Sequence, residues 1–129
     1  MKSAGRTVLG TVAGMALAFA LVVVVEMFSA VVHPVPANFD GSIAEHVRRY
    51  PQWVLGIVVL LWGATAAAAT WVASRMGGKP AGVIVTLLLA SALAFNLSML
   101  PYVMWFKIVM PAAVCVACLL GIKHGRRAS

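Results

Sequence analysis

Hydrophobic residues in this chain gather in long blocks and do not alternate with polar residues. Each block reaches the ~20 residues that a helix needs to cross a ~30 Å hydrocarbon core. We expect helices because lipid offers no hydrogen-bond partners to an open backbone. The predicted spans are residues 8–32, 53–73, 81–100 and 102–122.

The connections between these blocks are unequal. Residues 75–80, with the sequence RMGGKP, predict a tight turn, because glycine commonly ends a helix and proline commonly begins one. The connection around Pro101 is shorter still, so the last two blocks should be antiparallel neighbours.

Only the segment 33–52 is long enough to hold structure of its own. Ser42 and Glu45 match the capping box of a short amphipathic helix, which would lie on the outer membrane face or across the bundle mouth. The alternative is a surface loop. We therefore predict that residues 1–129 form a single all-α domain, a four-transmembrane-helix bundle with a short amphipathic outer helix between the first and second spans.

The composition excludes an ordinary soluble domain. Of the 129 residues, 63% are hydrophobic and only 10% are charged, too few to cover a solvent-exposed surface. The first block exceeds the ~7–15 apolar residues of a secretion signal, so we interpret it as a retained helix.

Basic residues predict the orientation. Seven of them flank the side that holds the termini, and three lie on the other side, which by the positive-inside rule places both termini in the cytoplasm. The seven are Lys2, Arg6, Arg75, Lys79, Lys123, Arg126 and Arg127, and the three are Arg48, Arg49 and Lys107. The net charge of +7 then suits the anionic headgroups of a lipid bilayer rather than nucleic acid. The expected location is the bacterial inner (plasma) membrane.

Three polar residues lie near the end of the first block. Glu26 is six residues inside Val32, or ~9 Å along the helix at ~1.5 Å per residue. Ser29 and His33 follow at i+3 and i+7 on the same helix face. An ionisable residue at this depth is costly, and it is a candidate functional site for that reason.

Lys107 is the expected partner of Glu26. A last helix beginning after Lys107 would keep 15 residues, or ~22 Å, too short to span the membrane. We therefore predict an outer-leaflet polar cavity formed by Glu26, Asn96 and Lys107, with Ser29 and His33 at its mouth. In the alternative, Lys107 extends to the interface, and a protonated Glu26 serves only in packing.

Cys115 and Cys118 form a C-x-x-C pair within the last block. Reactive pairs of this type usually sit at helix N-termini, where the helix dipole favours the thiolate, whereas these lie mid-helix. Four-helix quinone-linked thiol oxidoreductases also carry cysteines in outer loops, and this chain has two cysteines in total. Packing is the simpler interpretation, and a redox role is the alternative.

A metal site is a further alternative on the outer side. Its possible ligands are Glu26, His33, Asp40, Glu45 and His46. Their spacing matches no compact ligand motif, so we predict no metal and no cofactor. Nucleotide-binding loops and hydrolase motifs are also absent from the sequence, which leaves enzymatic activity uncertain and not favoured.

Three stretches carry a resemblance to a known family: VEMFSAVVHPVP, the FD…YP segment, and NLSMLPYVMWF. With these motifs the chain resembles a family of small, uncharacterised bacterial four-helix integral membrane proteins. The resemblance implies the same fold and draws attention to Glu26. It implies no activity or substrate.

Small residues predict close helix packing. Gly10 and Gly14 form a G-x-x-x-G motif, and the third block carries small residues at every fourth position: Gly82, Thr86, Ala90, Ala94 and Ser98. From these faces we expect a homo-oligomer or a membrane partner subunit.

The favoured function is a non-enzymatic membrane protein whose cavity binds a small polar or lipid-like ligand, or serves permeation or assembly. The alternatives are a membrane thiol oxidoreductase and an accessory structural subunit without a site.

Overall fold

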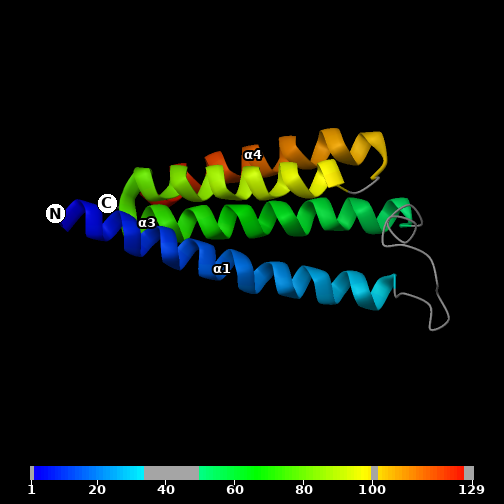
Figure 1. Cartoon of the computed structure of the whole chain (residues 1–129), viewed down its shortest axis with the longest axis horizontal. Helices are drawn as coiled ribbons and strands as arrows, with labels where there is room; N and C mark the ends of the chain where they lie inside the picture. Colours follow the sequence, from blue (N-terminus) through cyan, green and yellow to red (C-terminus); the bar gives the residue numbers. More distant parts are fainter. Residues whose placement is uncertain (1, 34–49, 100–101, 127–129) are drawn as a thin grey trace.

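A computed structural model describes residues 2–33, 50–99 and 102–126 (Figure 1). This part of the chain folds into three α-helices: α1 (Lys2–Val32), α3 (Gln52–Met99) and α4 (Met104–Arg126). The predicted all-α class is confirmed. The predicted outer helix falls almost wholly on residues 34–49, which lie outside the described residues.

The predicted number of helices is wrong. The blocks 53–73 and 81–100 belong to one helix of 48 residues, α3, with a kink at Gly78. There the backbone has φ 80° and ψ −176°, a conformation that glycine adopts without the steric cost a side chain would add. Pro80 remains inside the helix. The RMGGKP stretch is therefore a kink within α3 and not a loop between two helices.

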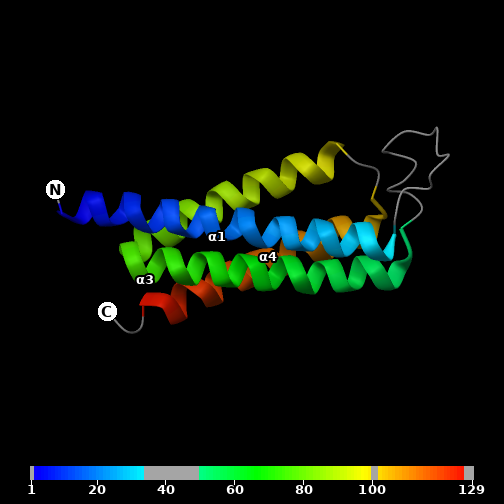
Figure 2. The ribbon, with the colours of Figure 1, turned by 90° about the horizontal axis from the view of Figure 1, so that it is seen from below.

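The kink folds α3 back on itself. A straight helix of 48 residues would be ~72 Å long, more than twice a ~30 Å hydrocarbon core. Instead, a first arm (residues 52–77) and a second arm (residues 79–99) run in opposite directions from Gly78 (Figure 1). The two arms separate toward their far ends (Figure 2).

Glycines bring the helices together at the end that holds both termini. A methyl group added at Gly10 of α1 would lie 2.6 Å from the carbonyl oxygen of Ala73, so the backbones of α1 and α3 touch there. On α4, a methyl group at Gly121 would lie 2.6 Å from the carbonyl oxygen of Ala67. The first arm of α3 is thus packed between α1 and α4, by the close approach that small residues allow in lipid. Gly10 finds its partner within the chain.

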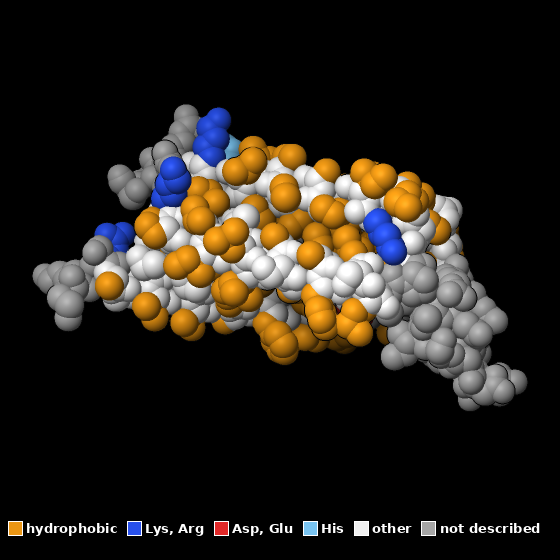
Figure 3. All heavy atoms as spheres, turned by 45° about the horizontal axis from the view of Figure 1, so that its top comes forward, with side chains coloured by type: hydrophobic (Ala, Val, Ile, Leu, Met, Phe, Trp, Pro, Cys, Tyr) orange, Lys and Arg blue, Asp and Glu red, His pale blue; other side chains and the backbone are white. Residues whose placement is uncertain are grey.

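The outer surface of the bundle is apolar. Figure 3 shows hydrophobic side chains over most of the visible face, and Lys and Arg mainly toward one end. Phe19 is 74% exposed and Val31 is 79% exposed. All three helices are long and apolar enough to cross a membrane. These features indicate an integral membrane protein.

Several threonine hydroxyl groups along α3 are satisfied by the helix itself. The Oγ1 of Thr65 donates to the carbonyl of Leu61 at 2.8 Å. The Oγ1 of Thr70 donates to the carbonyl of Ala66 at 2.7 Å. Such bonds within one helix remove the cost of a hydroxyl in an apolar layer without any partner helix.

Candidate functional site

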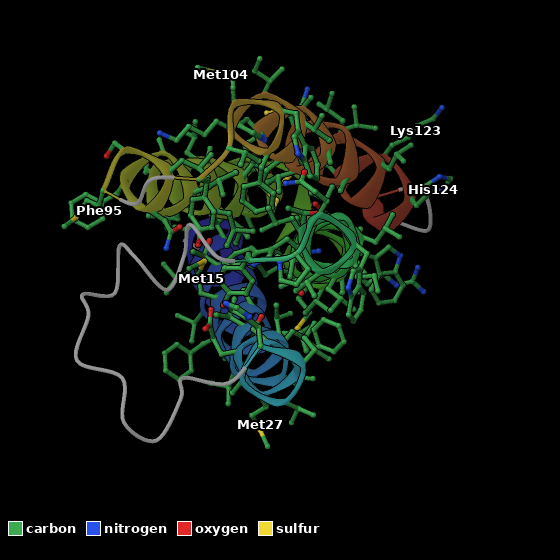
Figure 4. All side chains as sticks on the ribbon, turned by 90° about the vertical axis from the view of Figure 1, so that its right-hand side faces the viewer. Met15, Met27, Phe95, Met104, Lys123 and His124 are labelled. Carbon is green, nitrogen blue, oxygen red and sulfur yellow. The ribbon has the colours of Figure 1, made fainter. Side chains whose placement is uncertain are left out.

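The candidate site is a cavity of about 230 Å³ in the half of the bundle remote from the termini. Figure 4 looks into the bundle from that end, with α1, both arms of α3 and α4 around the centre. All these segments contribute wall residues. The cavity lies where the helices have separated, because the glycine contacts draw them together only toward the other end.

The structure brings together three of the polar residues proposed from the sequence. Glu26 and Ser29 lie one turn apart on α1, and Asn96 lies on the second arm of α3, and all three line the cavity. Ser29 is 8% exposed. Within the described part of the chain, no hydrogen bond ties the side chain of Glu26 or Asn96 to another residue. Their polar atoms are thus available to a ligand.

Lys107 does not line this cavity. Phe106 and Met110, one helical turn apart on α4, point into the wall, and each is about 2% exposed or less. Successive residues turn by ~100° around a helix of 3.6 residues per turn, so Lys107 is rotated away from the wall and is half-buried. Among the described side chains, no salt bridge joins Lys107 to Glu26. The depth of Lys107 suggested the pairing, but its angular position separates it from the cavity.

Two tyrosines complete the polar part of the wall, and sequence reasoning did not place them there. Tyr50 and Tyr102 lie just before the first residues of α3 and α4, and both line the cavity. His33 does not line the cavity, but its ring lies 4.5 Å from that of Tyr50, which brings Tyr50 against the end of α1. The signal in the sequence was weak, since both tyrosines lie beside helix ends and only the folded chain shows which way they face.

The pKa values of both tyrosines are raised by burial and by the charge of Glu26. Burial raises the pKa of Tyr50 above its ordinary value of 10, the charge of Glu26 raises it further, and a side-chain hydrogen bond with Ser29 lowers it. Burial is the largest cause that raises the pKa of Tyr102 to about 12, and the charges of Tyr50 and Glu26 contribute smaller electrostatic effects in the same direction. Both phenols therefore stay neutral at physiological pH, and a neutral phenol can donate a hydrogen bond.

The cysteines lie away from this cavity. Cys118 is fully buried, whereas Cys115 is exposed on the surface of α4, and both are free thiols. They are remote from the N-terminus of α4, the position at which a helix dipole would favour a thiolate.

A metal centre is not assembled by the described residues. No three His, Cys, Asp or Glu side chains in residues 2–33, 50–99 and 102–126 lie close enough to hold an ion together. Of the five candidate ligands, Asp40, Glu45 and His46 lie outside this part of the chain.

A second, larger hollow has a different character. It covers about 700 Å³ between the first arm of α3 and α4, and apolar residues such as Leu60, Ala64 and Val116 line it. This groove suits the acyl chains of surrounding lipid. The cavity at Glu26 is the one that combines apolar walls with converging polar groups, the usual character of a small-molecule site.

Comparisons of this chain with protein-family models, with curated proteins and with solved structures returned no match. The fold and the hydropathy of its helices define a small helical membrane protein, and a cavity lined by both polar and apolar residues lies at one end of the bundle.

Proposed function

We propose that this protein binds a small polar molecule in the cavity at Glu26 and that it acts without catalysing a reaction. The single observation that carries the proposal is the convergence of Glu26 and Ser29 from α1 with Asn96 from α3 on one partly open cavity. Glu26 lies within a membrane-spanning helix, and an ionisable residue at such a position usually marks a ligand, ion or proton site.

The wall chemistry supports a ligand rather than simple packing. In the described structure, Glu26 and Asn96 make no side-chain hydrogen bonds within the protein, although polar groups in an apolar layer normally find partners. The cavity volume of about 230 Å³ lies below the ~300–1,000 Å³ of pockets for drug-sized ligands. The ligand should therefore be a molecule with few non-hydrogen atoms.

The experiment measures the binding of three small probes of different charge to the wild type and to a variant in which a larger side chain partly fills the cavity. The probes are choline, its neutral analogue 3,3-dimethyl-1-butanol, and 3,3-dimethylbutyrate, each titrated into the detergent-solubilised protein by calorimetry. The variant Ala92→Leu adds bulk to the cavity wall, and Ala94→Leu makes the same change on the same arm at an exposed position away from the wall.

We expect at least one probe to bind, and Ala92→Leu to weaken its binding by about tenfold or more, since added side-chain volume in a filled site forces a clash. Ala94→Leu should bind like the wild type. If no probe binds, or if both variants bind equally well, the proposal is wrong.

We also propose that the protein resides in the bacterial inner membrane with both termini in the cytoplasm. The excess of basic residues on the side of the termini supports this orientation. That the cavity serves permeation or assembly remains a prediction. That the protein forms a homo-oligomer or binds a partner subunit also remains a prediction. The partner that Gly10 finds within the chain removes one of the observations that favoured assembly through α1.

A further inference from the structure

We infer that the ligand of this cavity is a small organic cation, such as an amine or a quaternary ammonium compound with short alkyl groups. The inference rests on the proposed function, because it names the chemical class of the ligand for the same site. Three properties of the wall lead to it: its charge, its aromatic content and its size.

The described part of the wall carries one acidic residue and no basic residue. Among the described residues that line the cavity, Glu26 is the only one with a side chain that can carry a full charge at neutral pH. The basic residue at a similar depth, Lys107, lies outside the wall and forms no salt bridge with Glu26 in the described structure. A carboxylate near an apolar layer is costly unless an opposite charge accompanies it. A cationic ligand would provide that charge.

The aromatic content of the wall suits an organic cation. Four aromatic residues line the cavity: Tyr50, Trp62, Tyr102 and Phe106. The rings of Tyr102 and Phe106 lie 4.7 Å apart, so they form a continuous aromatic surface. The faces of aromatic rings attract cations, and the attraction is strongest where water is excluded. Aromatic walls with one carboxylate are typical of sites that recognise ammonium groups.

Other ligand classes fit these residues less well. Among the described wall residues, an anion would meet Glu26 and no basic side chain. A divalent metal ion requires several oxygen, nitrogen or sulfur ligands. The described part of the wall offers one carboxylate, one amide and three hydroxyl groups among aromatic and aliphatic side chains. A neutral molecule would leave the charge of Glu26 uncompensated.

The test compares choline with 3,3-dimethyl-1-butanol, in which a carbon atom replaces the charged nitrogen at nearly the same shape. Binding to the solubilised full chain is measured by calorimetry for the wild type and for Glu26→Gln. Lys107→Gln is the matched control, because it removes a charge from α4 without altering the wall. Tyr102→Phe and Tyr102→Leu separate the aromatic ring from the hydroxyl group.

We expect the wild type to bind choline at least about tenfold more tightly than the neutral analogue, since a desolvated cation–π contact and a carboxylate both favour the charged ligand. Glu26→Gln should weaken choline binding by about tenfold or more and leave the neutral analogue unchanged, which also shows that the variant is folded. Tyr102→Phe should keep choline binding, and Tyr102→Leu should reduce it. Lys107→Gln should resemble the wild type.

The results separate the two proposals. If the neutral analogue or 3,3-dimethylbutyrate binds as well as choline, and Ala92→Leu abolishes that binding, the cation inference is overturned while the proposed function stands. If choline binding persists in Glu26→Gln, the inference is also overturned, because the carboxylate does not select the ligand. If none of the probes binds to the wild type, the proposed function fails together with the inference.

Discussion

At the scale of single residues, Gly78 has the largest effect on the architecture. It is the one glycine with a positive φ among the residues that the structure describes, and α3 reverses its direction there. A side chain in this conformation would crowd the adjacent carbonyl oxygen, which is why L-residues other than glycine rarely adopt it. One residue therefore determines that a 48-residue helix folds back across the same layer.

Replacing Gly78 with alanine should lower the free energy of unfolding by about 1–3 kcal/mol, the cost for an L-residue of a backbone conformation with positive φ and extended ψ. The measurement is unfolding in mixed micelles, followed by tryptophan fluorescence. Gly63→Ala is the control, because a methyl group at Gly63 meets nothing within 4 Å, and it should be neutral or stabilising. Equal stability of the two variants would contradict the role of Gly78.

At the scale of secondary-structure elements, the contact between α1 and α3 depends on glycine. An added methyl group at Gly10 would lie 2.6 Å from both the Ala73 carbonyl oxygen and the Gly77 nitrogen, which are backbone atoms that cannot rotate away. Lipid provides no hydrophobic driving force between helices, so close backbone packing contributes much of the association energy. The same contact holds the bundle closed at one end and leaves the cavity at the other.

Gly10→Ala should separate α1 from α3 and lower the free energy of unfolding by about 1–3 kcal/mol, as overpacking does in other tight contacts. Gly5→Ala lies on the same helix, where an added methyl group meets nothing within 4 Å, and should change the stability by less than about 0.5 kcal/mol. Unfolding of both variants under the same detergent conditions measures the difference. A Gly10→Ala protein as stable as Gly5→Ala would show that α1 is not held by this contact.

At the scale of the whole molecule, the path of the chain places both termini at one end of the bundle (Figure 1). The glycine contacts agree with this arrangement, since Gly77 meets the backbone oxygen of Arg6, and Gly125 meets that of Trp71. Figure 4 shows Lys123 and His124 side by side on α4. Basic residues thus accompany the termini, and the cavity lies toward the opposite face.

Cysteine labelling should report this topology. In a chain whose two native cysteines are replaced by alanine, an impermeant maleimide added to intact spheroplasts should label Gln52→Cys and should not label Gly5→Cys or Lys123→Cys. The reason is that positive charges are retained on the cytoplasmic side. After permeabilisation all three should react, which controls for accessibility. Labelling of Gly5→Cys in intact spheroplasts would reverse the proposed orientation.

The sequence by itself predicted part of the candidate site. Glu26, Ser29 and Asn96 were identified from their depth along hydrophobic blocks, and the structure places them on one cavity. The depth of a residue in the membrane follows from counting residues along the helix at ~1.5 Å each. The direction in which its side chain points relative to the other helices depends on how those helices pack against its own. For that reason Lys107 was assigned to the cavity that it does not line.

The sequence alone determined that the chain is apolar, helical and long enough to cross a membrane, because hydropathy and block length are properties of the residues themselves. Only the tertiary structure decided that two of the blocks form one kinked helix, because the departure from helical geometry occurs at Gly78 and the flanking residues remain helical. Tertiary packing also turned Tyr50 and Tyr102 inward, since burial against α1 and α4 is a property of the assembled helices and not of either residue.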